Sequence, residues 1–124
     1  MGDKVVDASA LAAVAFKEPE EEIARARLHG HRLFAPFLLS YEMANICRTK
    51  MKRDIAARTT IFEQFVDSRR VPIDLRDVDL SEVVELALRR NLTAYDASYL
   101  WLARHLRLEL VTLDGDLEDA AKLL

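Results

Sequence analysis

The sequence predicts a single α/β domain built on a short, mainly parallel sheet. Three observations lead to this prediction. Short apolar segments alternate with amphipathic helical segments, the length of 124 residues suits one domain, and 51% of the residues are hydrophobic. No linker, repeat or low-complexity tract interrupts residues 1–124, so we expect one domain with a buried core.

Cap and turn residues mark the ends of the predicted elements. Pro19 begins a helix and Gly30 ends it, while Asp79 and Glu82 form a capping box. Pro72 cannot donate to a strand ladder, which places its strand at an edge of the sheet. The predicted strands are 4–7, 32–35, 71–73 and 109–113, and the predicted helices are 9–16, 19–29, 38–52, 54–68, 80–90, 94–105 and 117–123.

The composition argues against several classes of protein. No apolar run reaches the roughly 20 residues of a membrane-spanning helix, and the first residues lead into a strand instead of a signal peptide. We therefore expect a cytoplasmic protein without a membrane partner. The single cysteine, Cys47, cannot form an internal disulfide, and no histidine spacing resembles a zinc site. A net charge of −3 gives no overall attraction to a polyanion.

Four acidic residues lie within or against apolar segments, where charge is hardest to explain. An ionised carboxylate in such surroundings is costly unless it is paired or binds a metal. Asp7 and Asp114 end the first and last predicted strands, and sites in open α/β sheets form beyond the carboxyl ends of strands. The sequence therefore predicts one shared site for a hard divalent cation, Mg²⁺ or Mn²⁺. The four acids are Asp7, Glu42, Asp96 and Asp114.

Helix capping is the competing explanation for three of these acids. Asp7 and Asp114 each precede a predicted helix, and capping and catalysis suit them equally. Asp96 fits a capping box, but its helix is apolar nearly all round, which directs the carboxylate into the protein or a cleft. Glu42 lies inside a helix on its apolar side, where capping is excluded and a functional role is favoured.

Further polar residues lie near these acids in the sequence. Asp116 is either a fifth metal ligand or the cap of the last helix, and capping is favoured. Ser9 and Thr112, each two residues from an acid, and Asn45, one turn after Glu42, are placed to support the site. A basic cluster at the end of the Glu42 helix either complements the helix dipole or contacts a phosphate backbone. It consists of Arg48, Lys50, Lys52 and Arg53.

Four short motifs contain these acids and follow one another over nearly the whole chain. They are Val5-Val6-Asp7-Ala8-Ser9-Ala10, Tyr41-Glu42-Met43-Ala44-Asn45, Tyr95-Asp96-Ala97 and Leu110-Val111-Thr112-Leu113-Asp114. Each motif is weak alone, but the ordered set is fairly specific. It resembles the PIN domain family, and within that family the VapC-type toxins of toxin–antitoxin pairs.

The resemblance implies a three-layer α/β/α sandwich with a four- or five-stranded sheet. It also implies an Mg²⁺- or Mn²⁺-dependent endoribonuclease, a cognate antitoxin and a homodimer. The family's catalytic acids correspond to Asp7, Glu42, Asp96 and Asp114, with Asp116 as a variable extra. Relatives often continue into a final strand after the last helix, so the number of strands stays open here.

The predicted chemistry assigns a role to each acid. Asp7, Asp96 and Asp114 hold the metal, directly or through water, and Glu42 orients the attacking water or completes a second metal site. A catalytically idle PIN-like binding module is the alternative, although retention of all four acids argues against it. A phosphorylated receiver domain is a weaker alternative. It needs paired acids after the first strand and an acceptor at the end of a central strand, whereas Asp54 follows a basic helical stretch.

Overall fold

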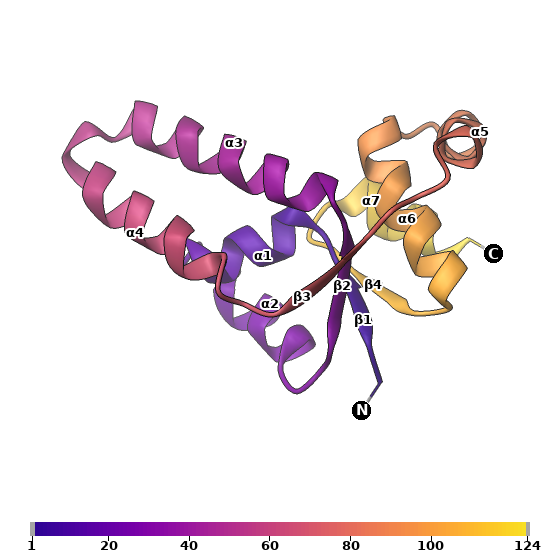
Figure 1. Cartoon of the computed structure of the whole chain (residues 1–124), viewed down its shortest axis with the longest axis horizontal. Helices are drawn as coiled ribbons and strands as arrows, with labels where there is room; N and C mark the ends of the chain where they lie inside the picture. Colours follow the sequence, from indigo (N-terminus) through magenta and orange to yellow (C-terminus); the bar gives the residue numbers. More distant parts are fainter. Residues whose placement is uncertain (1, 124) are drawn as a thin grey trace.

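The computed structural model describes residues 2–123 and shows a three-layer α/β/α sandwich (Figure 1). Its sheet has four strands in the order β3-β2-β1-β4, and every pair of neighbours is parallel. The predicted fold class is therefore confirmed. The strands are β1 (Lys4–Val6), β2 (Leu33–Pro36), β3 (Ile73–Arg76) and β4 (Glu109–Val111).

Helices form a layer on each side of the sheet (Figure 1). One layer contains α1 (Ala8–Ala15), α2 (Glu21–Leu28), α3 (Leu38–Arg53) and α4 (Arg58–Ser68), and the other contains α5 (Leu80–Arg90), α6 (Ala94–Leu106) and α7 (Gly115–Lys122). The long α3 and α4 pack side by side and extend well beyond the sheet. None of the helices in residues 2–123 has the length and apolar character needed to cross a membrane.

The strand order creates a switch point between β1 and β4. From β1 the sheet grows through β2 to β3 on one side, and β4 is then added on the other side. Val6 pairs with Val111, so β1 and β4 end at the same level. In open parallel sheets the crevice outside such a point is where ligands bind. The residues that follow these two strands, Asp7 and Thr112, therefore lie at the best-placed position for a site.

The packing around this point is dense. Val5, Val6 and Val111 are fully buried because helices cover both faces of the sheet. On α6, Leu100 and Leu102 are also almost completely buried, as expected for a helix that is apolar nearly all round. These contacts hold the first turn of α6, which carries an acid of the predicted site, in a fixed position beside β1.

Several element boundaries differ from the prediction for local reasons. The first strand stops before Asp7, which has turned to cap α1. The third strand runs over Ile73–Arg76 instead of 71–73, although its edge position is confirmed. The helix predicted from residue 54 begins only at Arg58, because Asp54 caps a short 3₁₀ turn by accepting a hydrogen bond from the Ala57 amide at 3.2 Å. For α5 the predicted bounds of 80–90 are correct.

Candidate active site

Asp7 is the most buried acid of the predicted site, with only 5% of its surface exposed. Its Oδ1 accepts hydrogen bonds from the Ala10 amide at 3.0 Å and the Ser9 hydroxyl at 2.7 Å. Its Oδ2 accepts a bond from the Thr112 hydroxyl at 2.5 Å. The first contact is a helix cap, and the last crosses from β1 to the end of β4. Asp7 thus caps a helix and also ties together the two strands that flank the switch point.

Asp114 reaches the same place through the loop that follows β4. The Asp114 amide donates to Thr112 Oγ1 at 3.0 Å, and the Leu113 amide donates to Ser9 Oγ at 2.9 Å. Asp114 also caps α7, since its Oδ1 accepts from the Leu117 amide at 2.9 Å. Ser9 and Thr112 therefore hold the loop against β1, which explains why hydroxyl residues stand two positions from each acid.

Glu42 faces the crevice from the second turn of α3. It is half-buried, and its Oε1 accepts a hydrogen bond from the Tyr99 hydroxyl at 2.5 Å. Tyr99 is 1% exposed and lies on α6, so this bond joins the two helical layers across the crevice. A buried phenol requires a polar partner. Sequence reasoning left Tyr99 out of the site, although its spacing of three from Asp96 was a signal for a shared helix face.

Asp96 lies in the first turn of α6. Its amide donates to Thr93 Oγ1 at 3.1 Å, so the predicted cap of this helix is present. Its carboxylate, however, forms no hydrogen bond with another residue in the range 2–123 and remains free to face the crevice. Asp116 is exposed in the first turn of α7, and its charge contributes to raising the pKa of Asp96. Asn45 lies one turn after Glu42 on α3, and both side chains line a hollow beside the crevice.

Burial and mutual repulsion make the ionised forms of Asp7, Glu42 and Asp96 costly. Burial raises the pKa of Asp7 above its ordinary value; three hydrogen bonds oppose this shift, and the charge of Asp114 adds to it. Burial likewise raises the pKa of Glu42 against the bond from Tyr99, with further upward shifts from Asp96 and Asp7. Burial raises the pKa of Asp96, helped by neighbouring carboxylates. The acids thus act on one another across a single crevice.

The donor set of this crevice fits a hard divalent cation. All the candidate ligands are carboxylate oxygens, which Mg²⁺ and Mn²⁺ prefer. Within residues 2–123, no lysine, arginine or histidine forms an ion pair with Asp7, Glu42, Asp96 or Asp114. In the same residues, no three acid, histidine or cysteine side chains converge into a ready-made ligand cage. A cation here would therefore keep some of its own water, as Mg²⁺ characteristically does.

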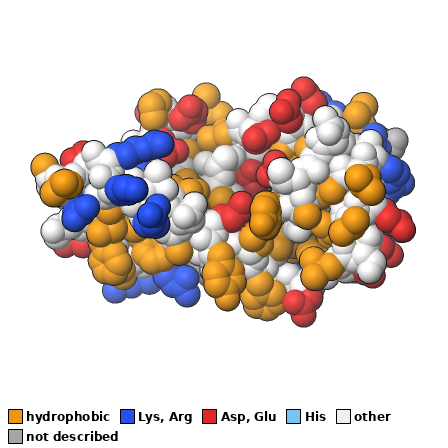
Figure 2. All heavy atoms as spheres, turned by 90° about the horizontal axis from the view of Figure 1, so that it is seen from above, with side chains coloured by type: hydrophobic (Ala, Val, Ile, Leu, Met, Phe, Trp, Pro, Cys, Tyr) orange, Lys and Arg blue, Asp and Glu red, His pale blue; other side chains and the backbone are white. Residues whose placement is uncertain are grey.

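Figure 2 shows acidic side chains lining a hollow in the middle of one face, with basic side chains gathered at the end formed by α3 and α4. Lys50 of the predicted basic cluster has a structural partner, since its Nζ lies 2.6 Å from the Glu18 carboxylate and 5.4 Å from the centre of the Phe16 ring. The other members form no ion pair with a described residue and are exposed: Arg48, Lys52 and Arg53.

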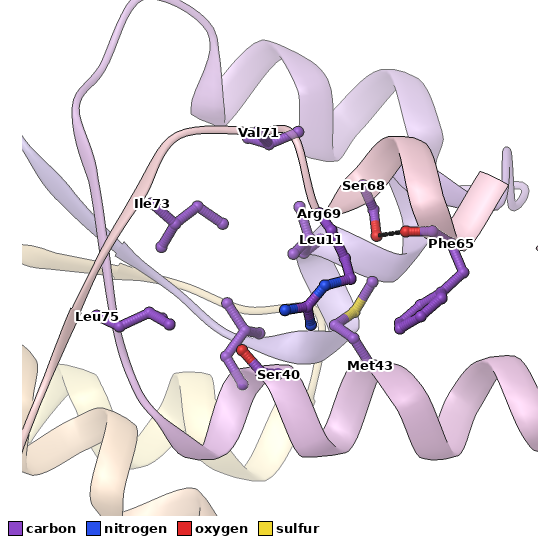
Figure 3. Close-up of a pocket in the computed structure, with 10 residues that line it drawn as sticks. Leu11, Ser40, Met43, Phe65, Ser68, Arg69, Val71, Ile73 and Leu75 are labelled. Atoms are coloured by element: carbon purple, nitrogen blue, oxygen red, sulfur yellow. Dashed lines mark hydrogen bonds between the residues drawn. The ribbon is translucent and has the colours of Figure 1, made fainter. Parts of the chain in front are cut away.

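A second hollow lies within the α1–α4 layer and contains none of the predicted acids (Figure 3). Its volume is about 110 Å³, and its walls include Leu11 on α1, Met43 on α3, Phe65 on α4 and Ile73 on the edge strand β3. The side chain of Arg69, directly after α4, points into this apolar space (Figure 3). The arrangement is a surface groove with one positive charge, separate from the acidic crevice.

Comparison with known proteins identifies the family. The sequence profile described as "PIN domain" matches residues 4–123, nearly the whole chain. The chain belongs to the PIN domain family. Ribonuclease VapC3 of Pyrobaculum aerophilum is 32% identical over 93% of this chain and 92% of its own length. Ribonuclease VapC9 of Mycobacterium tuberculosis is 34% identical over 95% of this chain and 91% of its own length.

A solved structure supports the same assignment. The crystal structure of PAE2754 from Pyrobaculum aerophilum superposes with a TM-score of 0.69 and 32% sequence identity, covering 98% of this chain and 89% of that one. The predicted membership of the VapC-type PIN proteins is confirmed, and a receiver domain is not supported. The roles of individual residues of this PIN domain stay predictions.

We expect the metal-free PIN domain to lose stability as the pH rises above the ordinary pKa values of its carboxyl groups. The pKa values of Asp7, Glu42 and Asp96 are raised in the folded state, so folding takes up protons in a window above their ordinary values of 3.8 and 4.5. The stability present at low pH is lost as the pH rises through these raised values. Asp74 and Glu109 have lowered pKa values, so the stability that they contribute is lost only as the pH falls below this window.

Melting temperatures in EDTA at several pH values measure this effect. In the Asp7→Asn/Asp96→Asn variant this loss of stability with rising pH should be much smaller, because two of the three titrating groups are gone. Replacing the exposed Asp67 by Asn is the matched control and should leave the dependence unchanged. A melting temperature of the parent chain that rises with pH above the ordinary carboxyl pKa values would contradict the prediction.

Proposed function

We propose that this chain is the toxin of a toxin–antitoxin pair and hydrolyses RNA phosphodiester bonds with Mg²⁺ or Mn²⁺. The observation that carries the proposal is the electrostatic coupling among Asp7, Glu42, Asp96 and Asp114, none of which forms an ion pair with a basic residue of the described chain. Relatives that share about a third of the sequence are named ribonucleases, which supports RNA as the substrate. A purely structural binding module would have no use for so costly a group of charges.

The residues of the chain divide the chemical work. Asp7, Asp96 and Asp114 would hold the cation, directly or through water, and Asp116 would add negative charge beside them. When bound, the cation supplies positive charge that makes water a better nucleophile and offsets charge on the phosphate oxygens. Glu42 orients the attacking water and accepts its proton; the raised pKa of its carboxyl suits that task. The expected products carry a 5′-phosphate and a 3′-hydroxyl.

Replacing either of two metal-holding acids should stop the reaction. Asp7→Asn and Asp96→Asn should each lower Mn²⁺-dependent RNA cleavage by at least about 10²-fold, because each removes a negative charge from the cation site. Mn²⁺ should raise the melting temperature of the parent chain, but not that of the double variant. Asp67→Asn serves as the control and should retain both properties. Full activity in a purified Asp7→Asn or Asp96→Asn protein would remove that residue from the mechanism.

We propose that the exposed basic residues at the end of α3 contact the RNA backbone. Lys52 lies ten residues after Glu42, or about 15 Å along the helix axis, within reach of a strand bound at the crevice. Lys50 is less suited to this role, because its charge already pairs with Glu18.

The salt dependence of RNA affinity distinguishes the two roles of the cluster. Lys52→Gln and Arg53→Gln should each flatten the salt dependence by about one unit of slope per lost phosphate contact. Arg107→Gln removes an equally exposed charge at the far end of α6 and should leave the slope unchanged. The titrations use Ca²⁺ and an Asp7→Asn background to limit cleavage. Unchanged slopes for both α3 variants would mean that these residues only complement the dipole at the end of the helix.

The antitoxin of this proposal would dock in the groove shown in Figure 3. The groove is lined mainly by apolar side chains, adjoins the edge strand β3, and contains Arg69, which forms no ion pair within residues 2–123. These features fit an apolar peptide segment that carries an acidic side chain. The occupant proposed here is such a segment of the cognate antitoxin.

Charge reversal at the groove tests this partner. Arg69→Glu should weaken inhibition of RNA cleavage by the cognate antitoxin, because a carboxylate would then face the acidic residue of the peptide. Arg70→Glu is the matched control, since Arg70 is the next residue and pairs with Asp67 instead. Cleavage without antitoxin should be the same in both variants. Equal inhibition of both would place the antitoxin on another surface.

A homodimer and a cytoplasmic location complete the proposal. On α5 one face is buried, while a row of large apolar side chains on the outer side remains exposed at intervals of four residues: Leu80, Val84 and Leu88. The same row on a second copy, related by twofold symmetry, would cover it. RNA and a newly made antitoxin are both available in the cytoplasm.

A further inference from the structure

A hollow of about 280 Å³ lies directly beside the acidic crevice, between α3 and the start of α6. Glu42 itself lines this hollow, so the hollow adjoins the acidic crevice. Its lining combines aliphatic, aromatic and amide groups with the one carboxylate. The residues that matter for its chemistry are Leu38, Tyr41, Glu42, Asn45, Ile46 and Tyr95.

One helix face provides most of this lining. Leu38, Tyr41, Glu42, Asn45 and Ile46 follow the spacing i, i+3, i+4, i+7 and i+8 along α3, so their side chains project on the same side. This is the side that carries Glu42 toward the crevice. Any ligand held by Glu42 and the neighbouring acids therefore meets these side chains next.

The two tyrosines of the hollow are unusually exposed. Tyr41 is 76% and Tyr95 is 63% exposed, and neither hydroxyl forms a hydrogen bond with any residue of the described chain. They come from different helices and both border the hollow. Asn45 is exposed as well, and its amide offers both hydrogen-bond donors and an acceptor. The two tyrosine rings can stack on the faces of a nucleobase, and the Asn45 amide can hydrogen-bond to its edge. The aliphatic side chains provide an apolar surface beneath the base.

We propose that Tyr41, Asn45 and Tyr95 form a subsite for one unpaired nucleobase next to the scissile phosphate; this inference rests on the function proposed above. A phosphate positioned at the acids places an adjoining nucleotide over the hollow, because the two are covalently linked. The base stacks on the rings of Tyr41 and Tyr95 and contacts Leu38 and Ile46. Its edge hydrogen-bonds with the Asn45 amide. A paired base cannot occupy this subsite, since its edge is already hydrogen-bonded and its faces are stacked within the helix.

Binding of a single-stranded RNA oligonucleotide tests the subsite, with Ca²⁺ and an Asp7→Asn background to limit cleavage. Tyr41→Ala and Tyr95→Ala should each weaken binding by about 5-fold to 150-fold, the range for one lost base–aromatic stack. Tyr95→Phe keeps the ring and should restore affinity. Phe62→Ala removes another exposed ring, on α4 and outside the hollow, and should have no effect. The same oligonucleotide in a duplex should bind more weakly and respond little to either tyrosine variant.

A double-mutant cycle with the RNA makes the test specific. Once the cut position has been mapped with the parent chain and Mn²⁺, each nucleotide beside it is replaced in turn by an abasic one. At the nucleotide that occupies the hollow, Tyr95→Ala should cost no further affinity. Additive losses at every position would overturn the subsite.

The remaining outcomes separate this inference from its rivals. If the parent chain cleaves RNA and the tyrosine variants bind RNA as the parent does, the subsite is wrong and the proposed function stands. If those variants bind RNA normally but no longer associate with a second copy, the hollow is a protein interface and the inference is also overturned. If the parent chain cleaves no RNA under any metal, the proposed function fails, while the oligonucleotide affinities still decide the subsite.

Discussion

The arrangement of the site depends on one buried carboxylate, that of Asp7. Each of its oxygens accepts a hydrogen bond from a hydroxyl group, one on α1 and one on the loop after β4. Parallel pairing brings the ends of β1 and β4 together, but pairing alone does not fix the loop that carries Asp114. The hydroxyls of Ser9 and Thr112 fix that loop, because each also accepts a hydrogen bond from one of its backbone amides. The side chain expected to hold the cation thus also organises its surroundings.

This arrangement makes stability and function oppose each other. Burial and the neighbouring carboxylates raise the pKa of Asp7, so its ionised form is held against an electrostatic cost. Its hydrogen bonds offset part of that cost but provide no positive charge. A folded domain that keeps several such carboxylates together has an unfavourable charge distribution until a cation binds. The same repulsion explains why we expect both protonation and metal binding to stabilise the fold.

Most of the fold could be predicted from the sequence because its signals are local. The alternation of apolar strands with helices indicated the parallel sheet, and Asp79 marked the start of α5 correctly. The four acids could be grouped because each stands against an apolar segment. Tyr99 could not be connected with Glu42, since their contact spans 57 positions and depends on the packing of two helical layers. The separate role of Lys50 was equally hidden, because it requires the position of Glu18.

The two helical layers contribute different parts of the acidic crevice, which links catalysis to packing. Asp7 and Glu42 belong to the α1–α4 side. On the other side, Asp96 lies in the first turn of α6 and Asp114 caps α7. The sheet and the Tyr99–Glu42 bond connect the two sides. A small shift of α6 on the sheet would therefore separate the acids without unfolding either layer. This constraint accounts for the nearly complete burial of α6 residues such as Leu100 and Leu102, whose packing determines the position of Asp96.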